Sequence, residues 1–190
     1  MQKSSVAEAL WLDCLESPIG NLLLVHDDRR RLRALDFSDY ETRMRRLLRL
    51  HYGREGTDFV LRARAAPGLT LSALEDYFAG DLTAIDTIEA TTAGTPFQRA
   101  VWTALRAIRV GSTCSYGALA HRIGRPRALR AVGLANGANP IGIVVPCHRV
   151  IGSDASLTGY GGGMARKRWL LNHEGIEFLD ADEDRNARVA

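Results

Sequence analysis

The stretch SYGALAHRIGRPRALRAVGLANGANP, residues 115–140, contains two short helical segments separated by a tight turn. The first segment breaks at Gly124, and Pro126 leads into the second, as expected of residues that stop and start helices. Two short helices joined by a glycine-containing turn are typical of a helix-turn-helix. By itself this pattern is a weak signal, because many helical hairpins share it.

The second of these helices is predicted to have two different faces. Small and apolar residues share one face: Ala128, Ala131, Val132 and Ala135. Such a face allows a neighbour to approach closely. Arg127 and Arg130, three residues apart, lie on another face. Their guanidinium groups could contact phosphates or could simply be solvated, and the basic sequence around them favours phosphates.

Charge is distributed unevenly along the chain. From residue 95 to residue 175, eleven basic residues stand against two acidic ones, a net charge of +9, whereas the rest of the chain carries −6. A compact basic segment indicates a polyanionic partner. Nucleic acid is favoured over a membrane, because no strongly amphipathic basic helix is present. A solvated basic surface without a partner is the alternative.

After the two helices comes IGIVVPCHRVIG, residues 141–152, where the β-branched run predicts a buried strand. Pro146 fixes the backbone before Cys147, so the thiol is expected to be held rigidly near the floor of a pocket. A packed core thiol is the plain alternative. A buried thiol is inert unless a base or a positive charge favours the thiolate, and His148 and Arg149 are candidates for that role. Adjacent residues of a strand point in opposite directions, so His148 would need a bend or a bridging water.

A carboxylate is expected to partner these buried polar groups, since an unpaired buried charge is costly. After Asp154, the nearest acidic candidate is Glu174, in WLLNHEG. A carboxylate that orients an imidazole, which in turn activates a thiol, is the general arrangement of nucleophile, base and orienting group. Metal binding is the poorer interpretation, because a lone Cys-His pair lacks the spacing of a zinc site.

The remaining segments predict a mixed helix-and-sheet protein. Residues 11–37 alternate like an antiparallel meander with hairpin turns, and residues 41–52 repeat apolar residues, Leu50 among them, at helical spacing. A second helix is predicted over residues 69–80 with Gly80 as its stop, and another after Pro96. The connector before Pro96 places a domain boundary near residues 87–95.

Length and composition are those of a folded protein, with 190 residues of which 46% are hydrophobic. No apolar run approaches the ~18 residues that span a bilayer, and the first residues lack an uninterrupted signal-peptide core. The three cysteines, Cys14, Cys114 and Cys147, form no CxxC pair. An odd number of cysteines without such pairs argues against a disulfide framework and predicts a cytoplasmic location.

Taken together, these residues resemble the O6-alkylguanine-DNA alkyltransferases, also called methylated-DNA–protein-cysteine methyltransferases. The matching motifs are PCHRVIG at 146–152, ANPI at 138–141, SYG at 115–117, RAVG at 130–133, LTGYGGG at 157–163 and KRWLLNHEG at 167–175. The resemblance is continuous from about residue 94 to residue 175 and extends more loosely to SPIG and RALDF in the N-terminal half. PCHR in this context is a strong signal, whereas SYG or RAVG alone would carry little weight.

The resemblance implies an α/β (α+β) fold of two domains. Residues 1–90 would form a ribonuclease-H-like domain of sheet and helices. Residues 91–176 would form a winged-helix-type helix-turn-helix domain that binds DNA and holds the alkyl acceptor. Residues 177–190 are expected to be a flexible charged tail. No cofactor and no metal are expected, since Cys14 and His26 are insufficient for a zinc site.

The resemblance also implies which residues form the site. The catalytic residues would be Cys147, His148, Glu174, Tyr116 and Asn139. The residues in contact with DNA would be Arg130, Arg127, Ser115, Tyr116, Ala131 and Gly133. The substrate pocket would be lined by Tyr160, Gly161, Gly162, Val150 and Pro146.

The implied activity is DNA repair by one irreversible transfer of an alkyl group from O6-alkylguanine, or O4-alkylthymine, to Cys147. The partner would be double-stranded DNA, bound through its minor groove by a monomer. Arg130 would replace the extruded nucleotide in the stack, and Tyr116 would hand a proton to the leaving guanine. Asn139 would brace the turn before Cys147, which Glu174, His148 and a water would activate.

Three positions depart from the pattern of the family. Cys114 stands where arginine is frequent and Ala138 where a larger polar residue is frequent, while Gly161 leaves room for alkyl groups larger than methyl. Three other functions compete with alkyl transfer. A lesion-recognition protein of the same fold would lack the active cysteine, and a cysteine hydrolase would need His121 or His173 as its base. A DNA-binding regulator would need a further module.

Overall fold

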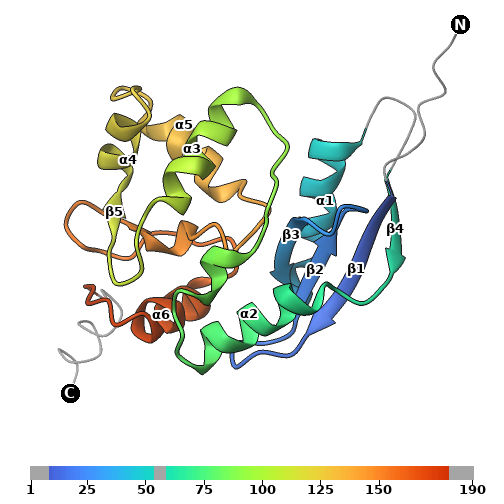
Figure 1. Ribbon diagram of the computed structural model, residues 1–190. Helices are drawn as coiled ribbons and strands as arrows, with labels where there is room; N and C mark the ends of the chain where they lie inside the picture. The colour runs from blue at the N-terminus through green and yellow to red at the C-terminus, as the bar shows by residue number, and fades with distance from the viewer. Residues whose placement is uncertain (1–8, 54–58, 180–190) are drawn as a thin grey trace, which may run out of the picture. The chain divides into compact units, whose positions relative to one another are not determined.

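The computed structural model describes residues 9–53 and 59–179. The chain folds into two compact units, shown in Figure 1. The first comprises Met1–Thr95 together with Pro140–Val144, and the second comprises Pro96–Asn139 together with Val145–Ala190. We expected one division of the chain, between residues 90 and 91. The structure differs, because five residues shortly before Cys147 belong to the first unit.

The first unit is built on a four-stranded sheet of order β3-β2-β1-β4. β1 (Ala9–Leu15), β2 (Leu22–His26) and β3 (Leu32–Phe37) form the expected antiparallel meander, which is thereby confirmed. β4 (Val60–Ala63) was not expected, and it pairs in parallel with β1. Its four residues are mostly exposed, so the sequence lacks the apolar alternation that marks a half-buried strand.

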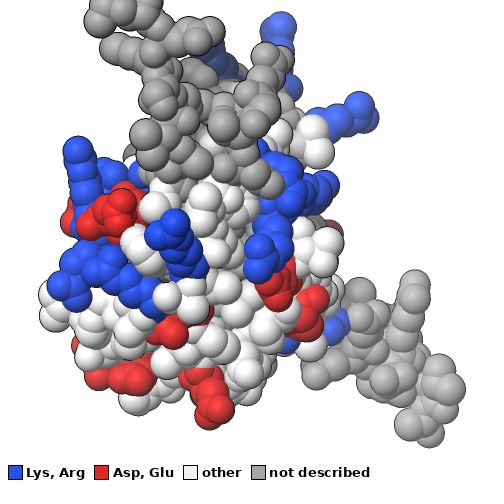
Figure 2. All heavy atoms as spheres, turned by 90° about the vertical axis from the view of Figure 1, so that its right-hand side faces the viewer, with Lys and Arg blue, Asp and Glu red and all other residues white. Residues whose placement is uncertain are grey.

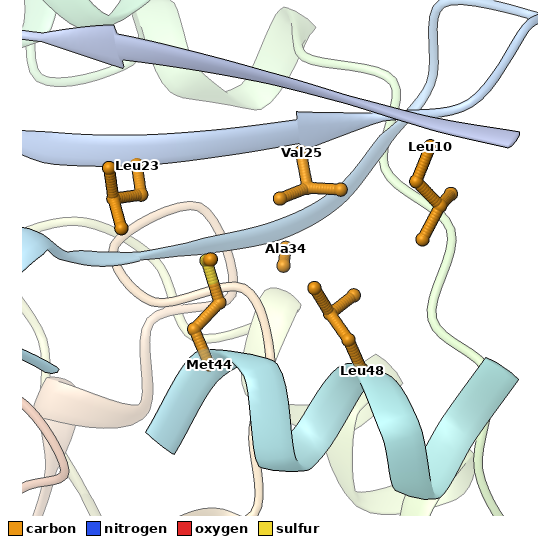
Figure 3. Packing of buried hydrophobic residues seen from close by; sticks show 6 residues of the cluster. All are labelled: Leu10, Leu23, Val25, Ala34, Met44 and Leu48. Atoms are coloured by element: carbon orange, nitrogen blue, oxygen red, sulfur yellow. The ribbon is translucent and has the colours of Figure 1, made fainter. Parts of the chain in front are cut away.

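Helix α1 (Glu41–Tyr52) follows the short helix η1 (Ser38–Tyr40) and packs on one face of this sheet. Figure 3 shows its side chains meeting those of three strands in a buried cluster of Leu10, Leu23, Val25, Ala34, Met44 and Leu48. Leu50 was expected on this apolar face but is 69% exposed. At 100° per residue it lies well away from Met44 and Leu48 around the helix.

The opposite sheet face is also buried, through Leu22, Leu24, Leu35 and Phe37, which are at most 1% exposed. The outer edge of β3 is paired by two short segments. Ala90 forms a parallel bridge with Leu32, and Ile141 forms one with Leu35. Hydrogen bonds from Leu35 N to Pro140 O and from Gly142 N to Leu35 O, both 2.9 Å, fix the second segment to the sheet.

Helix α2 (Gly68–Ala79) ends as expected at Gly80, and η2 (Ala84–Thr87) follows it. Gly80 has φ +114°, a left-handed conformation that favours glycine, and its N–H donates to the last turn of the helix. The end of α2 is therefore determined by one residue.

Several charged side chains of the first unit form ion pairs. Arg31 and Arg33 both bind Asp27, with nitrogen to oxygen distances of 2.7 and 2.9 Å. Arg43 and Asp36 form a further pair at 2.5 Å. Figure 2 shows basic and acidic side chains next to one another over the face that it presents. Interspersed charges of this kind neutralise each other locally.

The second unit contains the expected helix-turn-helix, which is confirmed. Its helices are α3 (Pro96–Arg106), α4 (Tyr116–Arg122), α5 (Leu129–Gly137) and α6 (Met164–His173). The indole Nε1 of Trp102 donates to Ala135 O at 2.8 Å and joins α3 to α5. Arg127 was expected on the second helix but lies in the turn before it, because α5 begins only at Leu129.

Two short strands complete this unit: β5 (Cys114–Ser115) pairs in parallel with β6 (Val150–Ile151). Part of the expected flexible tail is ordered, since Leu179 bridges to Ser156 and Phe178 packs against a cluster that contains Leu171. The remainder of that tail, from residue 180, lies outside the described residues. Within the described ranges, no helix has both the length and the apolar composition that a membrane crossing requires.

Candidate active site

Cys147 lies in a succession of tight turns. Its N–H donates to Val145 O at 2.7 Å across Pro146, whose φ of −80° and ψ of 65° form an inverse γ-turn. Cys147–Arg149 is then one turn of 3-10 helix, η3, which leads into β6. Consecutive residues of such a helix are about 120° apart, so the side chains of Cys147 and His148 do not point in opposite directions.

The buried strand expected over residues 141–145 is therefore wrong. Ile143 has φ +66°, a left-handed conformation that interrupts a strand. Residues 141 and 143–145 are nonetheless at most 3% exposed. The β-branched composition that predicted a strand reflects burial instead. A short apolar run indicates that a segment is buried, but it does not show whether that segment is a strand.

Cys147 is 6% exposed, and the amide of Asn139 contacts its thiol. Asn139 Nδ2 lies 3.1 Å from Cys147 Sγ and 2.7 Å from Val145 O. The amide has two hydrogens, so it can donate to both acceptors at once. Asn139 thus braces the turn, as expected, and also directs an N–H at the sulfur, which favours its charged form.

Next to the thiol, three buried polar side chains form one hydrogen-bonded group. His148 Nε2 is 2.9 Å from Glu174 Oε1. Arg149 binds both oxygens of Glu174, through Nε at 2.7 Å and Nη2 at 2.9 Å, and donates from Nη1 to Ile108 O at 2.6 Å. Glu174, the carboxylate that the sequence predicted as the partner of the buried His148, is therefore its partner in the structure, although it lies 26 residues later in the chain.

The protonation states of this group follow from its contacts. Burial would raise the pKa of Glu174, but hydrogen bonds and charges from His148 and Arg149 lower it to about 2. Burial lowers the pKa of His148 and outweighs the opposing effect of Glu174. At neutral pH, Arg149 therefore balances the carboxylate charge while the imidazole is neutral.

A neutral imidazole beside a carboxylate has a defined tautomer. The carboxylate accepts only, so Nε2 of His148 carries the hydrogen and Nδ1 keeps a lone pair. Nδ1 is buried without a hydrogen-bond partner among the described residues. His148 is therefore equipped to act as a base one residue after the thiol.

Tyr116 begins α4, immediately after the helix-capping residue Ser115, whose Oγ accepts from Ala118 N at 3.1 Å. The phenol oxygen of Tyr116 lies 3.0 Å from Thr158 Oγ1. A Cβ added to Gly133 would stand 3.9 Å from the Tyr116 ring, so α5 approaches that ring closely. That distance is an ordinary van der Waals contact, so the packing of α5 on this ring does not by itself require glycine at position 133.

The residues expected to contact the phosphates and the groove of DNA lie on the exposed side of the helix-turn-helix. Arg127, Arg130 and Ala131 are exposed, whereas Val132 and Ala135 are buried. Ala131 was grouped with these buried residues on one face, but it faces solvent. The exposed surface of α5 therefore combines one arginine with a small side chain next to it.

The expected pocket residues come from two segments. Pro146 and Val150 flank η3 and are buried. Tyr160 is half-buried, and its ring meets that of His148 edge to face, with centroids 6.4 Å apart at 85°. Gly161 and Gly162 lie in the turn after Tyr160, where Gly163 N donates to Tyr160 O at 3.1 Å. The structure thus brings the tyrosine loop beside the base.

Sequence reasoning missed two polar residues of this site, Lys167 and Thr158. Lys167 Nζ is fully buried and donates to Val150 O at 2.6 Å and to Thr158 O at 3.0 Å. One signal was present: the chain contains 23 arginines but only two lysines, Lys3 and Lys167. A lysine in a chain that otherwise uses arginine almost throughout indicates a position with particular requirements.

The histidines that a cysteine hydrolase would need are placed elsewhere. His121 is exposed on α4, and His173 stacks on Trp169 with ring centroids 4.7 Å apart. The buried imidazole joined to a carboxylate is that of His148. In the part of the chain that the structure describes, no cluster of three or more histidine, cysteine, aspartate or glutamate residues could hold a metal ion.

Both units match models of known families. Residues 12–90 match "6-O-methylguanine DNA methyltransferase, ribonuclease-like domain". Residues 96–176 match "6-O-methylguanine DNA methyltransferase, DNA binding domain". The chain is 56% identical over 165 residues to the methylated-DNA–protein-cysteine methyltransferase of Salmonella typhimurium, covering 87% of this chain and 95% of that protein. The protein of the same name from Mycolicibacterium paratuberculosis is 48% identical over 83% of this chain and 87% of its own.

Solved structures show the same fold. The O6-methylguanine methyltransferase of Mycobacterium tuberculosis superimposes with a TM-score of 0.70 and 41% identity, over 87% of this chain and 92% of that chain. The Mycobacterium tuberculosis OGT in complex with DNA gives a TM-score of 0.72 at the same identity and coverage. The expected ribonuclease-H-like and helix-turn-helix domains are confirmed by these similarities.

Proposed function

The chain belongs to the methylated-DNA–protein-cysteine methyltransferase family, and from this premise we propose that Cys147 is its alkyl acceptor. The chain binds DNA and repairs it by direct transfer of an alkyl group to the protein. The observation that carries the assignment is the pairing of an amide donor, 3.1 Å from Cys147 Sγ, with a neutral imidazole on the next residue. Both favour loss of the thiol proton.

The other cysteines lack this setting. Cys14 is exposed, and Cys114 is buried. Burial raises the pKa of the Cys114 thiol, and the charge of Arg122 opposes this only in part. A thiol whose pKa is raised is a poor nucleophile. A reducing location such as the cytoplasm is part of the proposal, because the acceptor must stay reduced.

The proposed reaction begins with the thiol. His148 Nδ1 takes the proton of Cys147 through a bridging water, and Glu174 and Arg149 hold the imidazole in its basic tautomer. The sulfur then bonds to the alkyl carbon while the bond from that carbon to guanine O6 breaks, and its electron pair stays with guanine. Tyr116 supplies the proton that neutralises the departing base. The products are a thioether at Cys147 and an intact guanine, so each molecule acts once.

Access to the lesion requires the nucleotide to leave the duplex, at a cost of a few kcal/mol. The exposed Arg130 would occupy the vacated space and offset part of this cost. Tyr160, Gly161, Gly162, Val150 and Pro146 would receive the base beside the thiol. Gly161, without a side chain, would leave room for alkyl groups larger than methyl, and O4-alkylthymine is proposed as a second substrate.

The test of the acceptor is an incubation with a duplex that carries one radiolabelled O6-methylguanine, followed by measurement of label on the protein. For the wild-type chain, label should saturate near one per molecule, and Cys147→Ser should take up none. Cys114→Ser is the matched control and should behave as wild type. Duplexes with O4-methylthymine and O6-benzylguanine, run in parallel, measure the lesion range. Label that stays on bound DNA would identify a recognition protein instead.

We also propose that a monomer binds double-stranded DNA through the minor groove. The support is the exposed face of α5, where the small residue Ala131 lies beside Arg130 and would permit entry into a narrow groove. Netropsin bound to A·T pairs beside the lesion should therefore slow transfer, whereas 5-methylcytosine, which changes only the major groove, should not. Sedimentation of the saturated complex should give one chain per lesion. The reverse pattern of inhibition would indicate major-groove binding.

A further inference from the structure

The pocket loop, residues 152–163 between β6 and α6, carries Tyr160, Gly161 and Gly162 outside any helix or regular strand. The strand before it and the helix after it fix only its two ends. Such a loop samples several conformations unless other contacts select one, and only the fraction in the binding conformation can receive a ligand. The contacts that select one conformation therefore affect what the pocket can bind.

The first half of the pocket loop is a tight turn. Gly152 N donates to Ser156 O at 2.8 Å, and Ala155 N donates to Gly152 O at 3.2 Å. Asp154 Oδ1 accepts from Ser156 N at 3.1 Å and from Ser156 Oγ at 2.6 Å. Ala155 closes the turn with φ +63°, a left-handed conformation that is unfavourable for alanine. Contacts from outside the turn are needed to support such a residue.

The end of α6 directs the chain back toward this turn. Gly175 has φ +68°, and its N–H donates to Asn172 O at 3.0 Å. The next N–H, that of Ile176, donates to Leu171 O at 2.9 Å. These two hydrogen bonds form a Schellman motif, which is commonly accompanied by an apolar contact. That contact is present, because Leu171 and Ile176 are buried in one cluster with Ile151 of β6.

Residues 176–179, the clamp segment, then pair with the pocket loop. Leu179 N donates to Ala155 O at 3.0 Å, and Leu157 N donates to Leu179 O at 3.4 Å, in the pattern of a parallel bridge. Phe178 packs against the same buried cluster as Ala155 and Leu157. The side chain of Leu179 contributes little to this packing, since the residue is 61% exposed. The clamp segment therefore holds the loop through its backbone and through Phe178.

The paired part of the loop leads directly to the residues expected to receive the base. Leu157, which donates to the clamp segment, lies three residues before Tyr160, whose ring meets that of His148 edge to face. The match to the DNA-binding domain ends at residue 176, so three of the four residues of the clamp segment lie beyond it. None of the motifs in the pocket or the helix-turn-helix includes these three residues.

We propose that the clamp segment is a positioning element of alkyl transfer. It holds the pocket loop in the conformation that receives the extruded base, so that less ordering of the loop remains when the lesion binds. The thiol of Cys147 and the helices α4 and α5 do not depend on it. The inference rests on the proposed transfer to Cys147.

The test is Leu179→Pro, because proline lacks the N–H that donates to Ala155 O. Transfer from a bound duplex with one radiolabelled O6-methylguanine should slow about tenfold, as for a loop that spends about a tenth of its time in the binding conformation. Leu179→Ala is the matched control. It shortens the same exposed side chain but keeps the N–H, and it should transfer at the wild-type rate.

Two further measurements on Leu179→Pro separate positioning of the loop from general damage. Its affinity for an undamaged duplex and the reaction of Cys147 with iodoacetamide across pH should both be as in wild type. A wild-type transfer rate in folded Leu179→Pro would overturn the proposal. A parallel loss of DNA affinity or of thiol reactivity would also overturn it, since the clamp segment would then support the whole unit and not the pocket loop.

A measurement with the clamp segment intact covers the case in which Leu179→Pro does not fold. Cys147→Ser should bind a lesion without reacting, and NMR can follow hydrogen exchange at the amides of Leu157 and Leu179. A duplex with O6-methylguanine should slow the exchange of both amides relative to an undamaged duplex, because coupling between two sites is reciprocal. Equal exchange with the two duplexes would contradict the proposal.

Failure of the proposed function would look different from failure of this inference. If Cys147 were not the alkyl acceptor, the wild-type chain itself would take up no label. If the clamp segment had no role, the wild-type chain and Leu179→Pro would take up label at the same rate.

Discussion

The imidazole of His26 lies inside the first unit, 3% exposed, and neither of its nitrogens has a hydrogen-bond partner among the described residues. Burial lowers its pKa from 6.5 to about 4, against the opposing charges of Asp13 and Asp27 and with the support of Arg30. A buried imidazole without partners stays neutral, because protonation would place an unpaired charge in the interior.

This histidine should make the fold sensitive to acid. Its folded pKa lies below its ordinary value, so the unfolded chain binds the proton first as pH falls. The corresponding stability is present above about pH 6.5 and is lost as pH falls toward 4, by up to about 3 kcal/mol. Urea denaturation at pH 7 and pH 4.5 measures this loss.

The comparison of two histidine variants isolates the effect. His26→Leu should lose less stability between the two pH values than wild type, since its core position no longer titrates. The exposed His121 changed to Gln should behave as wild type. A pH dependence that His26→Leu leaves intact would assign acid sensitivity to other groups, of which buried His148 is the first candidate.

At the residue scale, the sequence located the nucleophile and its partners better than their surroundings. Cys147, His148 and Glu174 were inferred from adjacency and from the need of buried polar groups for a partner, and the structure brings His148 and Glu174 together. Lys167 and Thr158 have no such rule, because their contacts are with backbone carbonyls and a hydroxyl on separate segments. Hydrogen bonds to carbonyls leave no pattern in a sequence.

At the element scale, helix α2 offers a matched pair of glycines at its two ends. Gly80, with φ +114°, ends the helix in a left-handed conformation, whereas Gly68 begins it in open space without such a requirement. Gly80→Ala should lower the free energy of unfolding by about 1 kcal/mol. Gly68→Ala should leave it unchanged or raise it slightly, since alanine reduces the freedom of the unfolded chain.

Thermal or urea denaturation of the two variants checks this prediction. Both substitutions add the same methyl group, so a difference between them reports backbone conformation and not composition. Equal effects of the two substitutions would show that the left-handed turn does not limit the stability of α2.

The elements that periodicity could predict are those with one continuous apolar face. α1, α3 and the first three strands bury such faces, and the sequence predicted each of them. β4 was missed because its residues are mostly exposed, and residues 141–145 were wrongly assigned to a strand because burial alone made them apolar. Helix boundaries were less certain, as Arg127 shows, because the turn before α5 is polar on both sides.

At the scale of the whole molecule, charge and fold divide in the same way. The excess of +9 between residues 95 and 175 falls on the unit with the helix-turn-helix, while Asp27, Asp36 and Glu41 pair with arginines in the first unit. Composition thus indicated which part of the chain meets DNA. The architecture of each domain came from the motifs, because neither charge nor periodicity specifies the order of strands in a sheet.

The five residues Pro140–Val144 pair with the edge of β3, although they belong by sequence to the later half of the chain. This placement affects the order in which the first unit can fold during synthesis on the ribosome. They are translated 45 residues after Thr95, roughly 2 to 9 seconds later at about 5–20 residues per second. Until then Leu35 of a nascent chain can pair with Leu24 of β2 but not with Ile141 on its other side. The first unit therefore completes its sheet only after the helix-turn-helix has been made, which ties the timing of its folding to the arrival of the residues just before Cys147.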